Sequence, residues 1–118
     1  MVERAKLLDR IHLQKYTYMI SQLILKEITA KEFQTLFLKI RREDYYWLSG
    51  SFEESTVKIL DTFFLDVDEY APDDLYDPDD PYNINEEELY IRAESTLKKL
   101  KRAVGTESAI QEQRGPND

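Results

Sequence analysis

Carboxylates are the most abundant chemically active side chains of this sequence, and half of them fall in one window. Between Lys58 and Arg92 there is no basic residue, yet this window holds twelve of the 24 aspartate and glutamate residues. The whole chain has a formal net charge of -8. Such a concentrated negative field repels nucleic acid and membrane surfaces and attracts basic partners. The sequence therefore favours a basic protein as the partner and argues against direct binding of nucleic acid or of a membrane.

A solubilising surface is the simplest interpretation of a charge run, but three features of this one favour partner binding. Clustered like charges destabilise the folded state by self-repulsion. The cluster occupies the one long predicted loop, residues 71–85, and the helix ends beside it, where binding residues often lie. The acids also alternate with large side chains, namely Tyr70, Leu75, Tyr76 and Tyr82. Interfaces use such a mixture of apolar anchors and steering charges.

A calcium site is the alternative interpretation of the acidic loop. Asp77, Asp79 and Glu88 occupy positions 1, 3 and 12 of a 12-residue helix-loop-helix calcium loop. That loop also needs an oxygen ligand at position 5 and glycine at position 6. Pro81 and Tyr82 occupy these two positions here. The pattern therefore predicts no metal site.

Other signatures of catalysis are missing from the sequence. The chain has one histidine, His12, three glycines and no cysteine. A nucleophilic triad, a thiolate metal site or a glycine-rich phosphate loop needs more than these. We expect His12 on the surface of the first helix. The sequence thus predicts a protein that is not an enzyme and has no cofactor.

An aromatic cluster, Tyr45–Trp47, ends the second predicted helix. We expect Trp47 and one of the two tyrosines in the core. The alternative is that one ring anchors an interface, because Trp and Tyr dominate binding hot spots. The preceding Arg41–Asp44 is predicted to be a solvated helix face whose charges pair with each other.

Three helix starts stand out in the sequence. Thr29 with Glu32 and Ser51 with Glu54 have the spacing of a capping box, in which a hydroxyl and a carboxylate satisfy two free backbone N–H groups. Asn85 precedes Glu86–Glu88, whose charges favour the positive end of a helix. Gly50 is the best candidate to close the helix before Ser51.

Apolar periodicity predicts an all-α fold. The four predicted helices cover about residues 13–26 (or an earlier start), 30–48, 52–70 and 85–105. Short turns between the first three imply antiparallel neighbours. We predict an antiparallel up-down four-helix bundle with the long acidic loop between the third and fourth helices. Residues 1–105 form a single domain, and residues 106–118 are expected to be a disordered polar tail. Without a membrane span or secretory signal, the chain is expected in the bacterial cytoplasm.

Four segments of the chain resemble the colicin D immunity protein family, the bacterial self-protective colicin-like immunity proteins. They are Ile28–Phe33 (ITAKEF), Phe37 with Arg41–Asp44 (RRED), Leu60 with Phe64–Asp73 (FLDVDEYAPD), and Asn85–Leu89 (NEEEL) with Leu97–Leu100 (LKKL). The likeness covers about Lys15 to Val104. It implies a four-helix bundle that neutralises a tRNA-cleaving toxin domain of a colicin or contact-dependent inhibition system in a 1:1 complex.

The resemblance also implies how the toxin is bound. Carboxylates would replace the RNA phosphates in a basic active site, with Asp68 and Asp73 first among the candidates. The supporting toxin-binding candidates are Asp66, Glu69, Asp74, Asp77, Asp79 and Asp80. The loop from Asp74 to Tyr82 is longer and more acidic than is usual in the family, which leaves the contact set open. An acidic adaptor, or a nucleic-acid mimic for another basic protein, is the alternative function.

Overall fold

The computed structural model describes residues 2–72 and 74–105, and these ranges form helices joined by turns and one long loop. The helices are α1 (Val2–Ile24), α2 (Ala30–Arg42), α3 (Tyr45–Leu48), α4 (Glu54–Glu69) and α5 (Glu86–Ala103). The predicted all-α class is confirmed. Within these ranges, the only β-type pairing is an isolated bridge between Tyr70 and Ile84.

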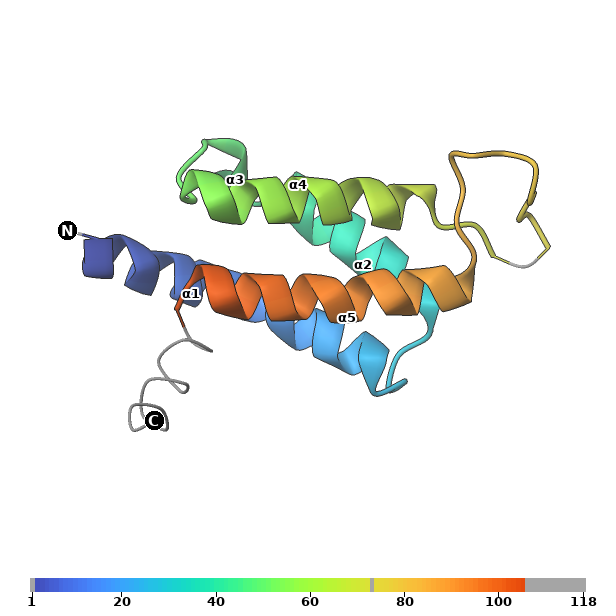
Figure 1. Cartoon of the computed structure of the whole chain (residues 1–118), viewed down its shortest axis with the longest axis horizontal. Coiled ribbons are helices and arrows are strands. Elements are labelled where there is room, and N and C mark those ends of the chain that lie inside the picture. Colours follow the sequence, from blue (N-terminus) through green and yellow to red (C-terminus); the bar gives the residue numbers. More distant parts are fainter. Residues whose placement is uncertain (1, 73, 106–118) are drawn as a thin grey trace, which may run out of the picture.

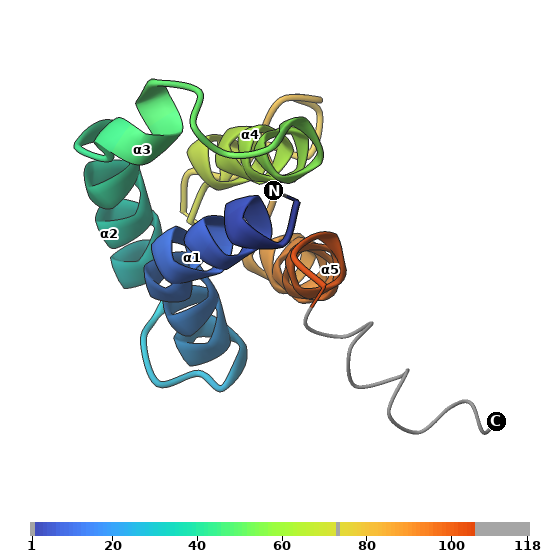
Figure 2. The same ribbon diagram turned by 90° about the vertical axis from the view of Figure 1, so that its left-hand side faces the viewer.

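The four long helices pack around one core. Helix α1 packs on α2 and α5, and α4 packs on the same two helices. Figure 1 shows α4 and α5 side by side and running in opposite directions, and Figure 2 shows α1 between α2 and α5. Aromatic and aliphatic side chains from all four fill the space between them, including the fully buried Tyr16, Phe33, Phe37, Leu60, Phe63 and Leu89.

Two of the three predicted helix starts are confirmed. The Thr29 side chain accepts from the Glu32 N–H at 3.0 Å, and the Glu32 carboxylate accepts from the Thr29 N–H at 2.9 Å. The Asn85 side chain accepts from the Glu88 N–H at 2.9 Å. Gly50, which follows α3, has a φ of +78°, a left-handed conformation that glycine adopts without strain.

The third predicted start, the capping box at Ser51, is wrong. Helix α4 begins at Glu54, and its N-cap Glu53 makes no side-chain capping bond. The Ser51 hydroxyl instead lies 2.8 Å from that of Ser49. The carboxylate of Asp9, from α1, accepts from the Glu53 N–H at 3.0 Å and so satisfies this helix end from another helix.

The predicted second helix is two helices, because the chain breaks at Asp44. The Asp44 carboxylate caps α3 by accepting from the Trp47 N–H at 3.3 Å, and it also accepts from the Tyr16 hydroxyl at 2.5 Å. Lys15 lies 3.2 Å from the same carboxylate, and Asp44 is only 6% exposed. The prediction that Arg41–Asp44 is solvated is therefore wrong for Asp44. A buried carboxylate with three partners occupies this position.

The aromatic cluster divides between core and surface. Trp47 is buried, as expected, and its indole N–H donates to Asp61 at 2.9 Å. The Arg41 guanidinium covers the rings of Trp47 and Phe64, at 5.0 and 4.2 Å from their centroids. Tyr46 is half-buried, stacks on His12 at a centroid distance of 3.7 Å and donates to Asp9 at 2.8 Å. His12 thus lies in a packed contact and not on an open surface.

A loop joins α4 to α5 and is tied together at its base. The Ala71 N–H donates to the Ile84 carbonyl and the Ile84 N–H donates to the Glu69 carbonyl, both at 3.0 Å. Tyr70 and Ile84, the residues of the bridge, are both buried. The loop projects from one end of the molecule (Figure 1). The predicted disordered tail, residues 106–118, lies outside the described residues.

Candidate protein-binding surface

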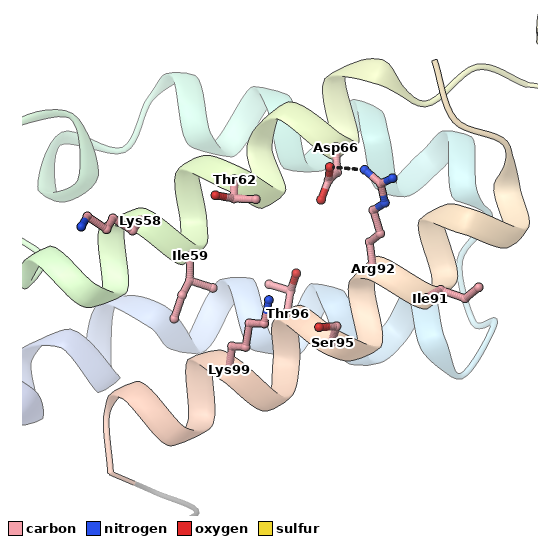
Figure 3. Close-up of a pocket in the computed structure, with 9 residues that line it drawn as sticks. All are labelled: Lys58, Ile59, Thr62, Asp66, Ile91, Arg92, Ser95, Thr96 and Lys99. Atoms are coloured by element: carbon pink, nitrogen blue, oxygen red, sulfur yellow. Dashed lines mark hydrogen bonds and ion pairs between the residues drawn. The ribbon is translucent and has the colours of Figure 1, made fainter. Parts of the chain in front are cut away.

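The carboxylates at the end of α4 do not act as one group. Asp66 points to α5, where Arg92 holds its carboxylate at 2.7 Å (Figure 3). Arg92 also holds the Glu88 carboxylate at 2.9 Å. Residues two positions apart on a helix do not share a face. Asp68 is accordingly exposed, and among the described residues its carboxylate has no hydrogen-bond or ion-pair partner. Glu69 is half-buried and contributes its backbone carbonyl to the base of the loop.

Gln34 of α2 fixes the last turn of α4. Its side-chain amide donates to the carbonyls of Val67 and Tyr70, both at 3.0 Å. The last carbonyls of a helix have no partner within the helix, so a donor from outside is needed where they are buried. Gln34 therefore ties α2 to the end of α4, next to Asp68 and the start of the loop. No sequence signal identified this residue, because the contact is between distant segments.

Two consecutive aspartate-proline turns shape the acidic loop. In the first, Asp77 accepts from the Asp79 N–H through its carboxylate at 2.9 Å and from the Asp80 N–H through its carbonyl at 3.0 Å. In the second, Asp80 repeats both bonds with Tyr82 and Asn83, at 2.8 and 3.4 Å. Proline favours the second position of such turns and aspartate the first. The Asn83 side chain also accepts from the Asp77 N–H at 3.1 Å and joins the two turns.

The remaining predicted site residues are mostly open to solvent. Asp74, Asp77, Asp79 and Asp80 are all exposed, and within the described residues the carboxylates of Asp74 and Asp79 have no partner. Asp73, one of the two leading candidates, lies outside the described residues. The structure therefore places Asp68 and the loop aspartates on the same end of the molecule, and it separates Asp66 from them by pairing it with α5.

The large side chains of the loop also separate into two kinds. Tyr70 and Ile84 are 7% exposed and belong to the core, whereas Leu75 and Tyr82 are 70% and 73% exposed. Tyr82 therefore does not pack on the body of the protein. The backbone turns and the buried base hold the loop in place, so that the ring of Tyr82 is not needed for that purpose.

Charge is distributed unevenly along α5. Its first turn carries Glu86, Glu87 and Glu88, and its last turn carries Lys101 and Arg102. Both sets complement the helix dipole. Burial and the nearby Glu86 raise the pKa of Tyr90 above its ordinary value. The N-terminal turn of α5, with its three glutamates, lies next to the acidic loop and extends the negative charge onto the helix.

Potential metal ligands and the groove between α4 and α5 are the other features of the described residues to consider beside the acidic loop. No group of three histidine, aspartate or glutamate side chains in these ranges is placed to hold a metal ion. A groove between α4 and α5 is lined by Lys58, Arg92, Lys99, Thr62, Ser95 and Thr96, together with Asp66 and two isoleucines (Figure 3). Its one carboxylate, Asp66, is paired with Arg92 at 2.7 Å.

Comparison with known families decides what kind of protein this surface belongs to. Residues 11–100 match the family described as "Bacterial self-protective colicin-like immunity". The chain belongs to this immunity-protein family. The expected resemblance is thereby confirmed at the level of the family, and the matched range includes α2, α3, α4 and the acidic loop. Comparisons with curated proteins and with solved structures gave no match.

Membership of the immunity family gives the chain a general role. Such proteins bind a cognate colicin-like toxin and neutralise it, and they are generally not enzymes. Among the described helices, none combines the length and the apolar character that crossing a membrane requires. The family match does not say which surface meets the toxin, so the acidic end is assigned below on physical grounds.

Proposed function

We propose that this immunity protein neutralises a nuclease toxin by covering its basic active site with an acidic surface. We define the acidic surface as Asp68, Glu69, Asp74, Asp77, Asp79 and Asp80. One observation carries the proposal: these residues belong to the end of α4 and to the loop at one end of the fold (Figure 1), and the carboxylates of Asp68, Asp74 and Asp79 have no partner among the described residues. Their charge is thus available to another molecule.

The chemistry of a nuclease explains why such a surface inhibits it. A nuclease active site is basic because it must hold a polyanion. Carboxylates at fixed positions can occupy the places of the RNA phosphates and block substrate. Opposite charge also speeds association, which lets the inhibitor capture a toxin before it acts. Some nuclease–immunity pairs reach dissociation constants of roughly 10⁻¹³ M or below, which shows that this strategy can be very tight.

Asp66 and Asp73 have different places in this proposal. Asp66 is already paired with Arg92 and is the weakest candidate for a direct toxin contact. Asp73 stays a leading candidate because of its position in the family motif, next to Pro72. The loop between Asp74 and Asp80 supplies the remaining charge.

The proposed mode of action is stoichiometric. We propose a 1:1 complex with a toxin domain that cleaves tRNA, delivered as a colicin or by contact-dependent inhibition. Because tRNA is the substrate, the encounter is in the bacterial cytoplasm. Blocking the active site needs no catalysis and no cofactor from the inhibitor, which agrees with the family's general character.

Titration calorimetry tests the proposal. The wild-type chain is titrated into the nuclease domain encoded beside it, and RNA cleavage is measured in parallel. Asp68→Lys and Asp73→Lys should each weaken binding at least about a hundredfold and restore cleavage, since close charge pairs in nuclease–inhibitor interfaces couple strongly. Glu43→Lys is the matched control. Glu43 is exposed at the C-terminal end of α2, outside the acidic surface, and its substitution changes the charge as much as Asp68→Lys does.

The outcomes separate the possible functions. If the Asp68 and Asp73 variants bind as tightly as wild type and still inhibit cleavage, the immunity function stands and the interface lies elsewhere. Tight binding without inhibition of cleavage would contradict active-site blocking. Absence of binding, together with micromolar binding to unrelated basic proteins, would favour the acidic adaptor.

A further inference from the structure

Two large side chains, Leu75 and Tyr82, stand exposed together on the acidic loop, among its carboxylates. Leu75 is 70% exposed and Tyr82 is 73% exposed. The apolar residues at the base of the same loop, Tyr70 and Ile84, are buried. The loop therefore has enough apolar side chains to fold onto the protein, yet it directs two of the largest away from it.

The backbone holds both residues in defined positions. The Leu75 N–H donates to the Pro72 carbonyl at 2.8 Å, and the Tyr82 N–H donates to the Asp80 carboxylate at 2.8 Å. Asn83 joins the turn at Asp77 to the turn at Asp80, and two backbone bonds of 3.0 Å close the base of the loop. A loop that is already ordered loses little conformational entropy when it binds. Leu75 and Tyr82 thus have the preorganisation expected of interface anchors.

The surrounding charge identifies the occupant. Asp74, Asp77, Asp79 and Asp80 are exposed on the same loop, without a basic residue between Lys58 and Arg92. A second copy of this loop would bring like charges together, which costs binding energy. An anionic membrane surface would be repelled for the same reason. A basic protein surface with apolar pockets could pair with the carboxylates and also bury Leu75 and Tyr82.

We propose that Leu75 and Tyr82 are the anchor residues of the toxin complex, each filling an apolar pocket beside the basic active site. This inference rests on the proposed function and adds a division of labour to it. The carboxylates steer the encounter and block the site, while the anchors hold the complex together.

The division of labour predicts two distinct kinetic effects. Exposed charges act mainly on the association rate and on its dependence on salt. Buried anchors act mainly on the dissociation rate, where most affinity differences between related complexes arise. Substitution of an anchor and substitution of a carboxylate should therefore be distinguishable without a structure of the complex.

The test is a kinetic binding measurement between the full chain and the nuclease domain at several salt concentrations. Leu75→Ala and Tyr82→Ala should each raise the dissociation rate at least about tenfold, as expected for hot-spot residues, and leave the association rate and its salt dependence within about twofold of wild type. Asp79→Lys should lower the association rate and its salt dependence. Tyr18→Ala, on α1, is the matched control because Tyr18 is 67% exposed and lies outside the acidic surface.

Each result has a defined meaning. Unchanged dissociation rates for both Leu75→Ala and Tyr82→Ala, while Asp79→Lys slows association, would overturn the anchor assignment and leave the proposed function intact. Failure of the wild-type chain to bind the nuclease would overturn both. Urea midpoints of the two anchor variants should equal that of wild type, because neither side chain packs on the core. A lowered midpoint would show a structural role and would contradict the assignment.

Discussion

Arg92 on α5 and Asp66 on α4 lie 2.7 Å apart, and this pair removes Asp66 from the acidic surface. Arg92 also binds Glu88, four residues earlier on its own helix, at 2.9 Å. One guanidinium therefore joins the end of α4 to the beginning of α5, the two helix ends between which the acidic loop extends. The hydrogen bonds that Arg92 donates to Glu88 and Asp66 raise its pKa above the ordinary value.

Removing Arg92 should destabilise the fold at this junction. Arg92→Met keeps the apolar stem and leaves Asp66, whose side chain is 14% exposed, without its partner. We expect a loss of about 1–2 kcal/mol in the free energy of unfolding, below the value for a fully buried pair because Arg92 is 39% exposed and water screens it. Urea unfolding measures it.

Lys58→Met is the matched control for the Arg92 substitution. Its partner Glu54 lies 3.7 Å away, and the two side chains are 75% and 83% exposed. Such an exposed pair contributes less than about 0.5 kcal/mol. Equal losses for the two variants would show that the Arg92 pair has no special role in holding α4 against α5.

Gln34→Glu should loosen the base of the acidic loop. The substitution replaces an amide donor by a carboxylate that faces the carbonyls of Val67 and Tyr70. Both part-buried carbonyls lose the amide donor and face a carboxylate instead, although the Val67 carbonyl keeps the Tyr70 N–H at 3.2 Å. We expect a loss of about 1–2 kcal/mol. Hydrogen exchange of the Ala71 and Ile84 amides should also quicken, because both N–H groups close the loop base. Gln14→Glu, at an exposed position of α1, should change neither quantity.

Local signals predicted those elements whose causes are local. The bonds at Thr29 and Asn85 form between residues three apart, and the sequence identified both helix starts. The start of α4 was misplaced because its backbone N–H is satisfied by Asp9, which is 44 residues away. The break before α3 did have a local signal, since Asp44 stands three residues before Trp47 at an N-cap position. This signal was overlooked because the apolar residues on either side, Ile40 and Trp47, fit the spacing of one continuous helix.

The candidate site was predictable as a segment but not residue by residue. Composition alone located the acidic window between Lys58 and Arg92. It could not show that Asp66 pairs with α5, because that contact joins residues 26 apart. It also could not separate the buried Tyr70 from the exposed Tyr82, because both are tyrosines in an acidic context. Burial depends on how the loop closes, and the Tyr70–Ile84 bridge determines this.

Asp9→Ala should be among the more destabilising substitutions in the chain. Asp9 is 1% exposed and accepts from the Tyr46 hydroxyl at 2.8 Å and from the Glu53 N–H at 3.0 Å. Alanine leaves both donors unsatisfied next to the core. We expect a loss of about 3 kcal/mol, measured by urea unfolding. Asp9→Asn keeps one acceptor oxygen and should lose less; an equal loss would mean that the charge and not the hydrogen bonding matters.

Asp44 should make stability depend on pH in the acid range. Burial raises the pKa of Asp44, but hydrogen bonds from Tyr16, from the Trp47 N–H and from Lys15 outweigh burial, so that the pKa lies below its ordinary value. The folded state therefore favours the ionised carboxylate. Its contribution is present above the unfolded pKa of about 4 and is lost as the pH falls through the folded pKa. The difference in urea midpoint between wild type and Asp44→Asn should shrink as the pH falls below about 4. A constant difference would contradict this.

Tyr46 should produce the opposite dependence in the alkaline range. Burial, the hydrogen bond to Asp9 and the charges of Asp9 and Glu53 raise the pKa of Tyr46 from 10.0 to about 12. The folded state favours the protonated phenol, so its contribution is complete below the unfolded pKa and is lost as the pH rises through the folded pKa. The stability difference between wild type and Tyr46→Phe should therefore fall between pH 10 and about 12. Tyr45→Phe is the control, because Tyr45 is 81% exposed and the substitution removes the same hydroxyl from a position that does not pack on the core. If the stability differences of the two variants changed with pH in the same way, the Tyr46–Asp9 hydrogen bond would not be the cause of the alkaline pH dependence.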